Sequence, residues 1–294
     1  MSSQTLPPPI ARFSDGVVRR VLPNGLTVLI KPNRVAPVVA VASYVKAGYF
    51  NEPDDRAGLA HLLEHMYFKG CRKYPGPEDI GMAVEAVGGN LNAGTIYDYT
   101  YYYFTLPRES FEKGVEIQAD ALAHPLFDPD ELRREAEVII EESKRKYDNP
   151  SAFAAEKLYE LAFDRHWMRR WRIGSDRVLR AITRETVVDF FASSYRPANM
   201  IVAVVGSVDP DAALSVIERE FGTIPVGTVH TETSPPEPPQ TALKYQELRG
   251  DINQEYLEIG FHAPGVLAPD TDALDLAAAI IGRGRSARLY QRVK

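Results

Sequence analysis

The sequence has little of several things that commonly reveal a function. Its 294 residues include a single cysteine and two tryptophans, and no apolar run is long enough to cross a membrane. The lone Cys71 excludes an internal disulfide and a zinc site built from the cysteines of one chain. Residues 1–16 lack the basic and apolar regions of a signal peptide. We therefore expect a soluble protein of a reducing compartment, the cytoplasm, without a membrane partner.

Positive charge is also in short supply. The 34 lysines and arginines are outnumbered by 40 aspartates and glutamates, which gives a formal net charge of -6. The two signs are interspersed, and no basic stripe of the kind that follows a phosphate backbone is present. The composition therefore predicts no nucleic-acid partner.

Apolar residues, by contrast, make up 45% of the chain, enough for the core of one large domain or two ordinary ones. Two β-branched runs around Asn24-Gly25 predict a hairpin, and further strands are predicted at 37–48, 91–107 and 199–208. Helical patterns and caps predict helices at 57–69, 78–87, 110–124, 128–147, 152–163, 175–182, 183–195 and 209–222. This mixture predicts an α+β fold.

A proline-rich, polar segment at 228–241 is typical of a linker between domains. It separates a first subdomain, 1–227, from residues 242–294, where the pattern predicts a strand at 255–264, a helix at 271–282 and a further element from 286 onwards. So short a segment is small for an independent domain. We expect it to be the start of a second α+β subdomain that is incomplete.

The helix predicted from residue 57 carries two histidines and a glutamate on one side. At about 100° per residue, His65 lies about 40° from His61, and Glu64 lies about 60° from His61 in the other direction. The apolar stripe is on the opposite side and consists of Leu59, Leu62, Leu63 and Met66. Histidines one turn apart can hold one Zn²⁺, and a neighbouring glutamate can activate water there. The alternative, a pair of core histidines, is disfavoured because the histidines stand apart from the leucines.

A zinc site of this kind needs a third ligand, and the long helix at 128–147 offers candidates. Glu135 and Glu142 are two turns apart and lie along one border of its apolar stripe. A carboxylate at such a border can turn inward to a metal. Periodicity alone leaves both glutamates open as the ligand.

The motif His61-Leu62-Leu63-Glu64-His65 resembles the inverted zinc signature of the inverzincins. Its surroundings resemble the pitrilysin/insulinase family of metallopeptidases, which includes the mitochondrial processing peptidases and their bacterial relatives. The matching segments, in family order, are EPDDRAGLAHLLEHMYFKG, GGNLNAGTIYDYTYYYFTLP, EAEVIIEESKRKYDNP and SYRPANMIVAVVGSVDP. The resemblance implies a two-layer subdomain with a mostly antiparallel sheet covered by helices, followed by a second homologous subdomain.

The resemblance also implies roles for individual residues. One Zn²⁺ per chain is held by His61, His65 and Glu142, with Glu64 as the general base. Glu135 matches a second glutamate that supports the site without being a ligand. The segment Asn92, Ala93, Gly94 and Thr95 matches the strand that pairs with an extended substrate, although relatives often carry a bulkier residue where Gly94 stands.

The activity implied is that of a zinc metalloendopeptidase acting on extended or unstructured peptides. In the family a second homologous half supplies an arginine and a tyrosine, for which this sequence has no match. The predicted partners are therefore a peptide substrate and a homologous second half or a second copy of the chain. The alternative function is a catalytically inactive scaffold, against which the full zinc set argues. The loop at 164–174, rich in arginine and tryptophan, is predicted to pack at the surface, with contact to a substrate or partner as the alternative.

Overall fold

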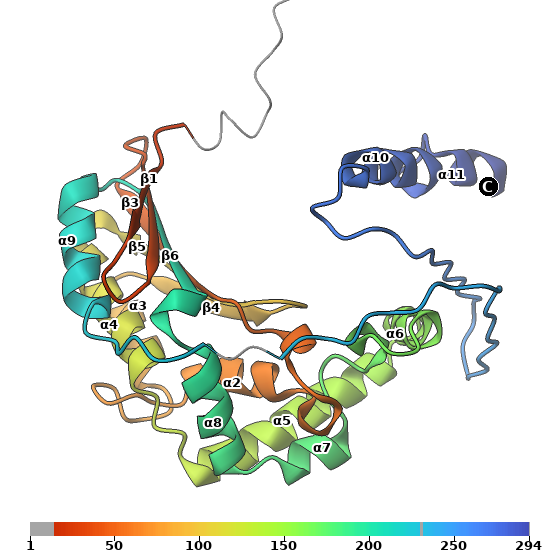
Figure 1. The fold of residues 1–294 in the computed structure, drawn as a ribbon, viewed down its shortest axis with the longest axis horizontal. Coiled ribbons are helices and arrows are strands. Elements are labelled where there is room, and N and C mark those ends of the chain that lie inside the picture. The colour runs from red at the N-terminus through yellow and green to blue at the C-terminus, as the bar shows by residue number, and fades with distance from the viewer. Residues whose placement is uncertain (1–14, 230–231, 294) are drawn as a thin grey trace, which may run out of the picture. The chain divides into compact units, whose positions relative to one another are not determined.

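The computed structural model describes residues 15–229 and 232–293. These residues divide into two compact units, and the boundary along the chain lies between Pro238 and Pro239. Figure 1 shows the fold of each unit. Residues 1–14, which contributed to the cytoplasmic prediction, lie outside the described residues, as do 230–231 of the predicted linker and Lys294. None of the helices in the described ranges is both long and apolar enough to span a membrane.

The first unit is built on one six-stranded sheet with the order β1-β2-β6-β3-β5-β4. Its strands are β1 (Val18–Val21), β2 (Thr27–Pro32), β3 (Val38–Val45), β4 (Asn90–Thr95), β5 (Thr100–Pro107) and β6 (Met200–Gly206). Only β2 and β6 pair in parallel, so the prediction of a mostly antiparallel sheet is confirmed. The hairpin predicted at Asn24-Gly25 joins β1 to β2. β4 is an edge strand, paired on one side only by β5.

The strand predicted over 91–107 is confirmed except at 96–99, where the segment folds back to form the hairpin of β4 and β5. The turn between them is closed by a hydrogen bond from the Ile96 amide to the Tyr99 carbonyl, at 2.9 Å. Asp98 lies in this turn, and aspartate is depleted in strands and favoured in turns. A short helical turn at Tyr49–Asn51 holds the hairpin through the amide of Tyr49, which donates to the Ile96 carbonyl at 3.1 Å.

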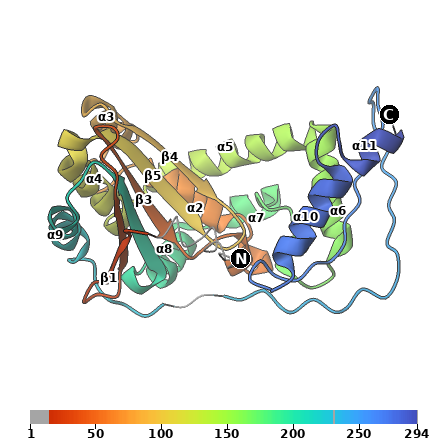
Figure 2. The same cartoon turned by 90° about the horizontal axis from the view of Figure 1, so that it is seen from above.

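The helices of the first unit follow the predicted pattern closely. They are α2 (Leu59–Tyr67), α3 (Asp79–Ala86), α4 (Phe111–Ala123), α5 (Pro129–Tyr147), α6 (Pro150–Ala162), α7 (Asp176–Ala181), α8 (Arg184–Ser194) and α9 (Pro210–Phe221). The side chains of Ser175 and Thr183 cap α7 and α8 as expected. α4 and α9 pack together on one face of the sheet, and α5 runs alongside α2 (Figures 1 and 2).

The core lies between the sheet and these helices. Alternate residues of the central strands point toward it, among them Val41, Phe104 and Val204, each fully buried. The leucine stripe of α2 joins this core, with Leu59 and Leu62 fully buried. Burial of this stripe fixes the rotation of α2 about its axis. The opposite side of α2 therefore turns toward α5, the helix that carries the candidate glutamates.

A buried carboxylate fixes the beginning of α2. Glu52 is 1% exposed and accepts hydrogen bonds from the amides of Gly58, at 2.8 Å, and Ala60. Gly58 has a φ of +99°, and a Cβ there would stand 2.7 Å from the carbonyl oxygen of Ile173. Arg170 secures the same loop by donating to the Glu52 carbonyl at 2.7 Å. The helix with the two histidines is thus held at its N-terminus as well as along its apolar side.

Burial raises the pKa of Glu52 to about 7, although the amides of Ala60 and Gly58 and the charge of Arg170 act to lower it. Between pH 4.5 and 7 the unfolded chain therefore loses a proton that the folded chain keeps. We expect the free energy of unfolding, relative to a Glu52→Gln variant, to fall by up to about 3 kcal/mol as the pH rises across this range. Urea denaturation at several pH values measures it. Asp55→Asn, in an exposed position of the same loop, should leave the pH profile of the wild type unchanged. The expectation would be contradicted if the unfolding free energy of the wild type, relative to that of Glu52→Gln, increased with rising pH.

The second unit contains α10 (Thr271–Gly282) and α11 (Arg288–Val293), both at predicted positions. The strand predicted at 255–264 was wrong, since no residue of this segment is in a strand. A strand needs a neighbour for its backbone hydrogen bonds, and the described residues from 239 to 293 offer none. Apolar side chains of the segment are accordingly exposed, including Leu257 and Phe261.

Candidate functional site

Three potential metal ligands converge where α2 meets α5. His61 and His65 come from α2 and Glu142 from α5, and one donor atom of each lies within 4.8 Å of the other two. The Nε2 atoms of both histidines stand 3.9 Å from Oε2 of Glu142. These distances are too long for hydrogen bonds, so the three donors face one another without bonding. Of the two glutamates that periodicity left open, Glu142 is the one that joins the histidines.

The other glutamate fixes the orientation of His65. Oε2 of Glu135 lies 2.9 Å from Nδ1 of His65. Oε1 of Glu135 forms an ion pair with Nζ of Lys69 at 2.7 Å. Although burial alone would raise the pKa of Glu135, hydrogen bonds from His65 and Lys69 hold it below its usual value. The carboxylate is therefore ionised at neutral pH. It favours the tautomer of His65 with a proton on Nδ1, which leaves the Nε2 lone pair for a metal.

His61 is set up as a neutral ligand by its surroundings. Burial lowers the pKa of His61 to about 3, and the charges of His65 and Lys146 act in the same direction. At neutral pH no proton therefore competes with a metal for the imidazole. Nδ1 of His61 is buried and has no hydrogen-bond partner among the described residues.

The donor set fits zinc. Two imidazoles and one carboxylate form a ligand set found in catalytic zinc sites, which leave the fourth position to water or substrate. Tetrahedral ligands about 2.0–2.2 Å from zinc stand roughly 3.5 Å apart. The 3.9 Å separations between each histidine and Glu142 therefore have to shorten by a few tenths of an ångström, and the donor atoms of the two histidines lie within 4.8 Å of each other.

Glu64 lies beside this donor set, one residue before His65. Its Oε2 accepts a hydrogen bond of 2.6 Å from Oγ1 of Thr95, the last residue of β4. Burial raises the pKa of Glu64, and the hydrogen bond from Thr95 partly opposes the shift. A carboxylate whose pKa is raised toward neutrality is a better proton acceptor than an ordinary one. Thr95 thus connects the glutamate to the edge strand.

The predicted substrate strand is the open edge of the sheet. Asn92, Ala93 and Gly94 of β4 pair with β5 through residues 101–103, which leaves the other edge of β4 without a strand among the described residues. At position 94 the glycine lies against the side chain of Tyr101. A Cβ there would come within 2.8 Å of the ring of Tyr101, so this ring occupies the space a side chain would fill.

Several residues near the site were not predicted from the sequence. Lys69 and the hydrogen bond of Thr95 to Glu64 had no signal in the pattern, because both depend on tertiary contacts. For the loop at 164–174, the structure favours the alternative to simple surface packing at one residue. Arg172 from this loop lines a cavity of about 280 Å³ together with His61 and Glu142.

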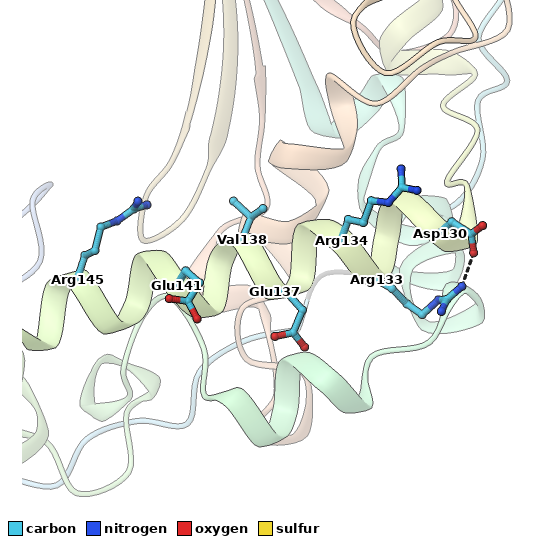
Figure 3. A pocket seen from close by; sticks show the side chains of 7 residues that line it. All are labelled: Asp130, Arg133, Arg134, Glu137, Val138, Glu141 and Arg145. Carbon is cyan, nitrogen blue, oxygen red and sulfur yellow. Dashed lines mark hydrogen bonds and ion pairs between the residues drawn. The ribbon is translucent and has the colours of Figure 1, made fainter.

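A larger hollow, about 690 Å³, lies over the outer side of α5, away from the metal donors. Figure 3 shows the seven α5 side chains that line it, between Asp130 and Arg145. They are mostly charged and of both signs, and Asp130 is paired with Arg133 one turn along the helix. Glu137 pairs with Arg180 of α7 at 2.9 Å. We interpret this side of α5 as a solvated surface.

Comparison with known proteins identifies the family. The model of the insulinase family, peptidase family M16, matches residues 27–174, which include His61, Glu64, His65, Glu135, Glu142 and the whole of β4. The chain belongs to the insulinase (M16) family. The model of the M16 inactive domain matches residues 181–294. M16 membership confirms the family predicted from the sequence.

Proteins similar to this chain include several that are named as proteases. A protein of Rickettsia felis named an uncharacterized zinc protease is 30% identical over 274 residues, which cover 93% of this chain and 65% of that protein. A protease from Helicobacter pylori has a similar structure, with a TM-score of 0.83, 25% identity, and coverage of 94% of this chain and 68% of that one. The periplasmic protease PqqL of Escherichia coli has a TM-score of 0.70 at 25% identity, and the match covers 75% of this chain and 25% of PqqL. The chain thus spans only part of its curated relatives, 65% of the Rickettsia felis protein and 64% of a similar one from Mycobacterium leprae.

Because it orients His65, Glu135 should tune the metal affinity of the M16 site without being essential to it. We expect Glu135→Gln to weaken zinc binding by roughly 10- to 100-fold, since the variant loses the charge that polarises the imidazole. Competition with a chromophoric chelator measures the affinity. Glu137→Gln, on the same helix but half-exposed and paired with Arg180, is the matched control. Equal affinities in the two variants would show that Glu135 does not act on the metal.

Proposed function

We propose that this chain is the zinc-binding part of a zinc-dependent endopeptidase that hydrolyses extended or unstructured peptides. The observation that carries the proposal is the convergence of His61, His65 and Glu142, with Glu64 beside them and in contact with the edge strand. Membership of the M16 family supports it. The presence of Glu64 favours hydrolysis over a scaffold or a purely structural metal site, neither of which would need this carboxylate.

Bound at His61, His65 and Glu142, zinc would polarise the scissile carbonyl and lower the pKa of water. Glu64 accepts the proton of the attacking water and then passes it to the departing amine. Its raised pKa suits both steps, and Thr95 holds the carboxylate in place between them. Glu135 keeps His65 in the tautomer that the metal needs.

The substrate in this proposal lies along β4. The edge of β4 that no strand covers offers backbone groups to a peptide in extended conformation, and the Ala93 amide, which donates to Oδ1 of Asn92 at 2.8 Å, would have to exchange that partner for the peptide. Main-chain pairing requires the substrate to be a strand, so unfolded chains are selected over folded proteins. Thr95 is the last residue of this strand and donates a hydrogen bond to Glu64, so a peptide paired with β4 lies next to the catalytic carboxylate.

We infer that a homologous second half completes the active chamber, contributed by further residues of the same protein, by a second copy of this chain or by another chain. The difference in length between this chain and its M16 relatives supports this part of the proposal. The cytoplasmic location stays a prediction, because one structural relative is periplasmic.

Hydrolysis of an unstructured fluorogenic peptide by the purified, zinc-loaded chain tests the proposal, together with elemental analysis of the same sample. We expect about one zinc per chain and cleavage that a chelator abolishes and added zinc restores. Zinc without cleavage would move the test to mixtures with a homologous partner, and absence of zinc would overturn the proposal.

A further inference from the structure

The cavity next to the metal donors has a cationic wall. Its lining includes His61 and Glu142, and it extends to Lys146 and Arg172. Lys146 follows Glu142 by one turn on α5, whereas Arg172 comes from the loop after α6. The two cations are partly open to solvent, with side-chain exposures of 28% and 26%. Any group that enters this space therefore meets both the metal donors and these positive charges.

One carboxylate, that of Glu156 on α6, serves both cations. Its Oε1 accepts from Nε of Arg172 at 2.9 Å and also pairs with Lys146. The Glu156 side chain is only 2% exposed, and its Oε2 is buried without a hydrogen-bond partner among the described residues. The negative charge is thus covered while the positive charges are accessible. One acidic group shared by two basic ones leaves this end of the cavity with a net positive charge.

Arg172 is held in a fixed orientation. Its Nη1 donates to the hydroxyl of Tyr97 at 2.8 Å, and its guanidinium lies 5.4 Å from the ring centroids of Tyr97 and Tyr159. Tyr97 belongs to the turn that follows β4, so the cation is tied to the end of the edge strand. A preorganised guanidinium loses little conformational entropy when it binds a carboxylate.

We propose that this cavity is a subsite that selects an acidic side chain of the peptide, by means of Lys146 and Arg172. The inference rests on the proposed function, since it assumes a peptide along β4. The carboxylate of an aspartate or glutamate would form charge-assisted hydrogen bonds with one or both cations, and a lysine or arginine would be repelled. The negative charge of Glu142 does not cancel this preference when the Glu142 carboxylate is bound to zinc.

Three peptides that differ in one residue test the subsite. The cleavage site of a neutral peptide is first mapped by mass spectrometry, and glutamate, glutamine or lysine is then placed in turn at each position flanking it. At one position we expect kcat/KM to be about fivefold higher for glutamate than for glutamine, and lower for lysine. The ratio should shrink as salt is added. Equal values for all three peptides at every position, or a preference for lysine, would overturn the proposal.

A variant pair assigns the preference to the cavity. Lys146→Met should bring the glutamate-to-glutamine ratio close to one. Lys144→Met removes a lysine from the exposed side of the same helix, where it pairs with Glu141, and should keep the ratio. An unchanged ratio in Lys146→Met would remove Lys146 from the proposal, with Arg172→Met then deciding whether the cavity acts at all.

Binding separates failure of the subsite from failure of the proposed function. Fluorescence anisotropy of labelled peptides with the zinc-loaded Glu64→Gln variant measures the preference without turnover. Preferential binding of the glutamate peptide without any cleavage by the wild type would support the subsite and count against hydrolysis. Cleavage without any preference for the glutamate peptide would support hydrolysis and count against the subsite. The absence of cleavage and of preferential binding would overturn both proposals.

Discussion

Replacement of Glu64 by glutamine is expected to leave zinc bound and to lower kcat by roughly 10³-fold. The amide has the size of the carboxylate and can still accept the hydrogen bond from Thr95, but it cannot take a proton from water. Because Glu64 is not among the three converging donors, the metal should stay. Zinc content and single-turnover hydrolysis of the same preparation measure the two effects separately.

The control for this variant is Glu85→Gln on the exposed side of α3, which should keep full activity. Loss of zinc in Glu64→Gln would contradict the role given to this residue, because it would make Glu64 part of the ligand set. Full activity with zinc bound would mean that another group accepts the proton.

Replacement of Glu142 by alanine is expected to abolish high-affinity zinc binding, with the dissociation constant raised by 10³-fold or more. The variant keeps the two imidazoles one turn apart but lacks the carboxylate that completes the ligand set. A metal that binds only the folded chain stabilises it by about 2.7 kcal/mol when present at 100 times its Kd. Addition of zinc should therefore raise the melting temperature of the wild type by several degrees and leave that of the variant unchanged.

The neighbouring residue supplies a matched control. Glu141 is 63% exposed and pairs with Lys144, so Glu141→Ala should bind zinc like the wild type. If zinc raised the melting temperature of Glu142→Ala as much as that of Glu141→Ala, the third ligand would have to be sought elsewhere, with Glu135 as the nearest carboxylate on the same helix.

Most elements of the first unit were predictable because they carry a local signal, although the break between β4 and β5 was missed. The hairpin at Asn24-Gly25, the caps Ser175 and Thr183 and the period of α5 act over a few residues. Sheet order was beyond such signals, since the insertion of β6 between β2 and β3 joins segments more than 150 residues apart. The strand at 255–264 failed for a related reason: its alternation is real, but a strand forms only where a partner exists.

The site divides in the same way. Helix geometry alone put His61, Glu64 and His65 on one side of α2, away from the leucines. It did not separate Glu142 from Glu135, because both lie on the same border of α5 and the choice depends on how α5 crosses α2. The cationic cavity was out of reach as well, since Lys146, Glu156 and Arg172 come from two helices and a loop that only the fold brings together.

The open edge of β4 has a consequence for the behaviour of the protein in solution. An edge without a neighbouring strand can pair with an extended chain, including the strand of another copy, and such edges are where aggregation of sheet proteins begins. Most proteins shield them with prolines, charges or a covering helix. Here the six residues of β4 include no proline and no charged side chain, so the strand is as open to self-association as it is to a peptide.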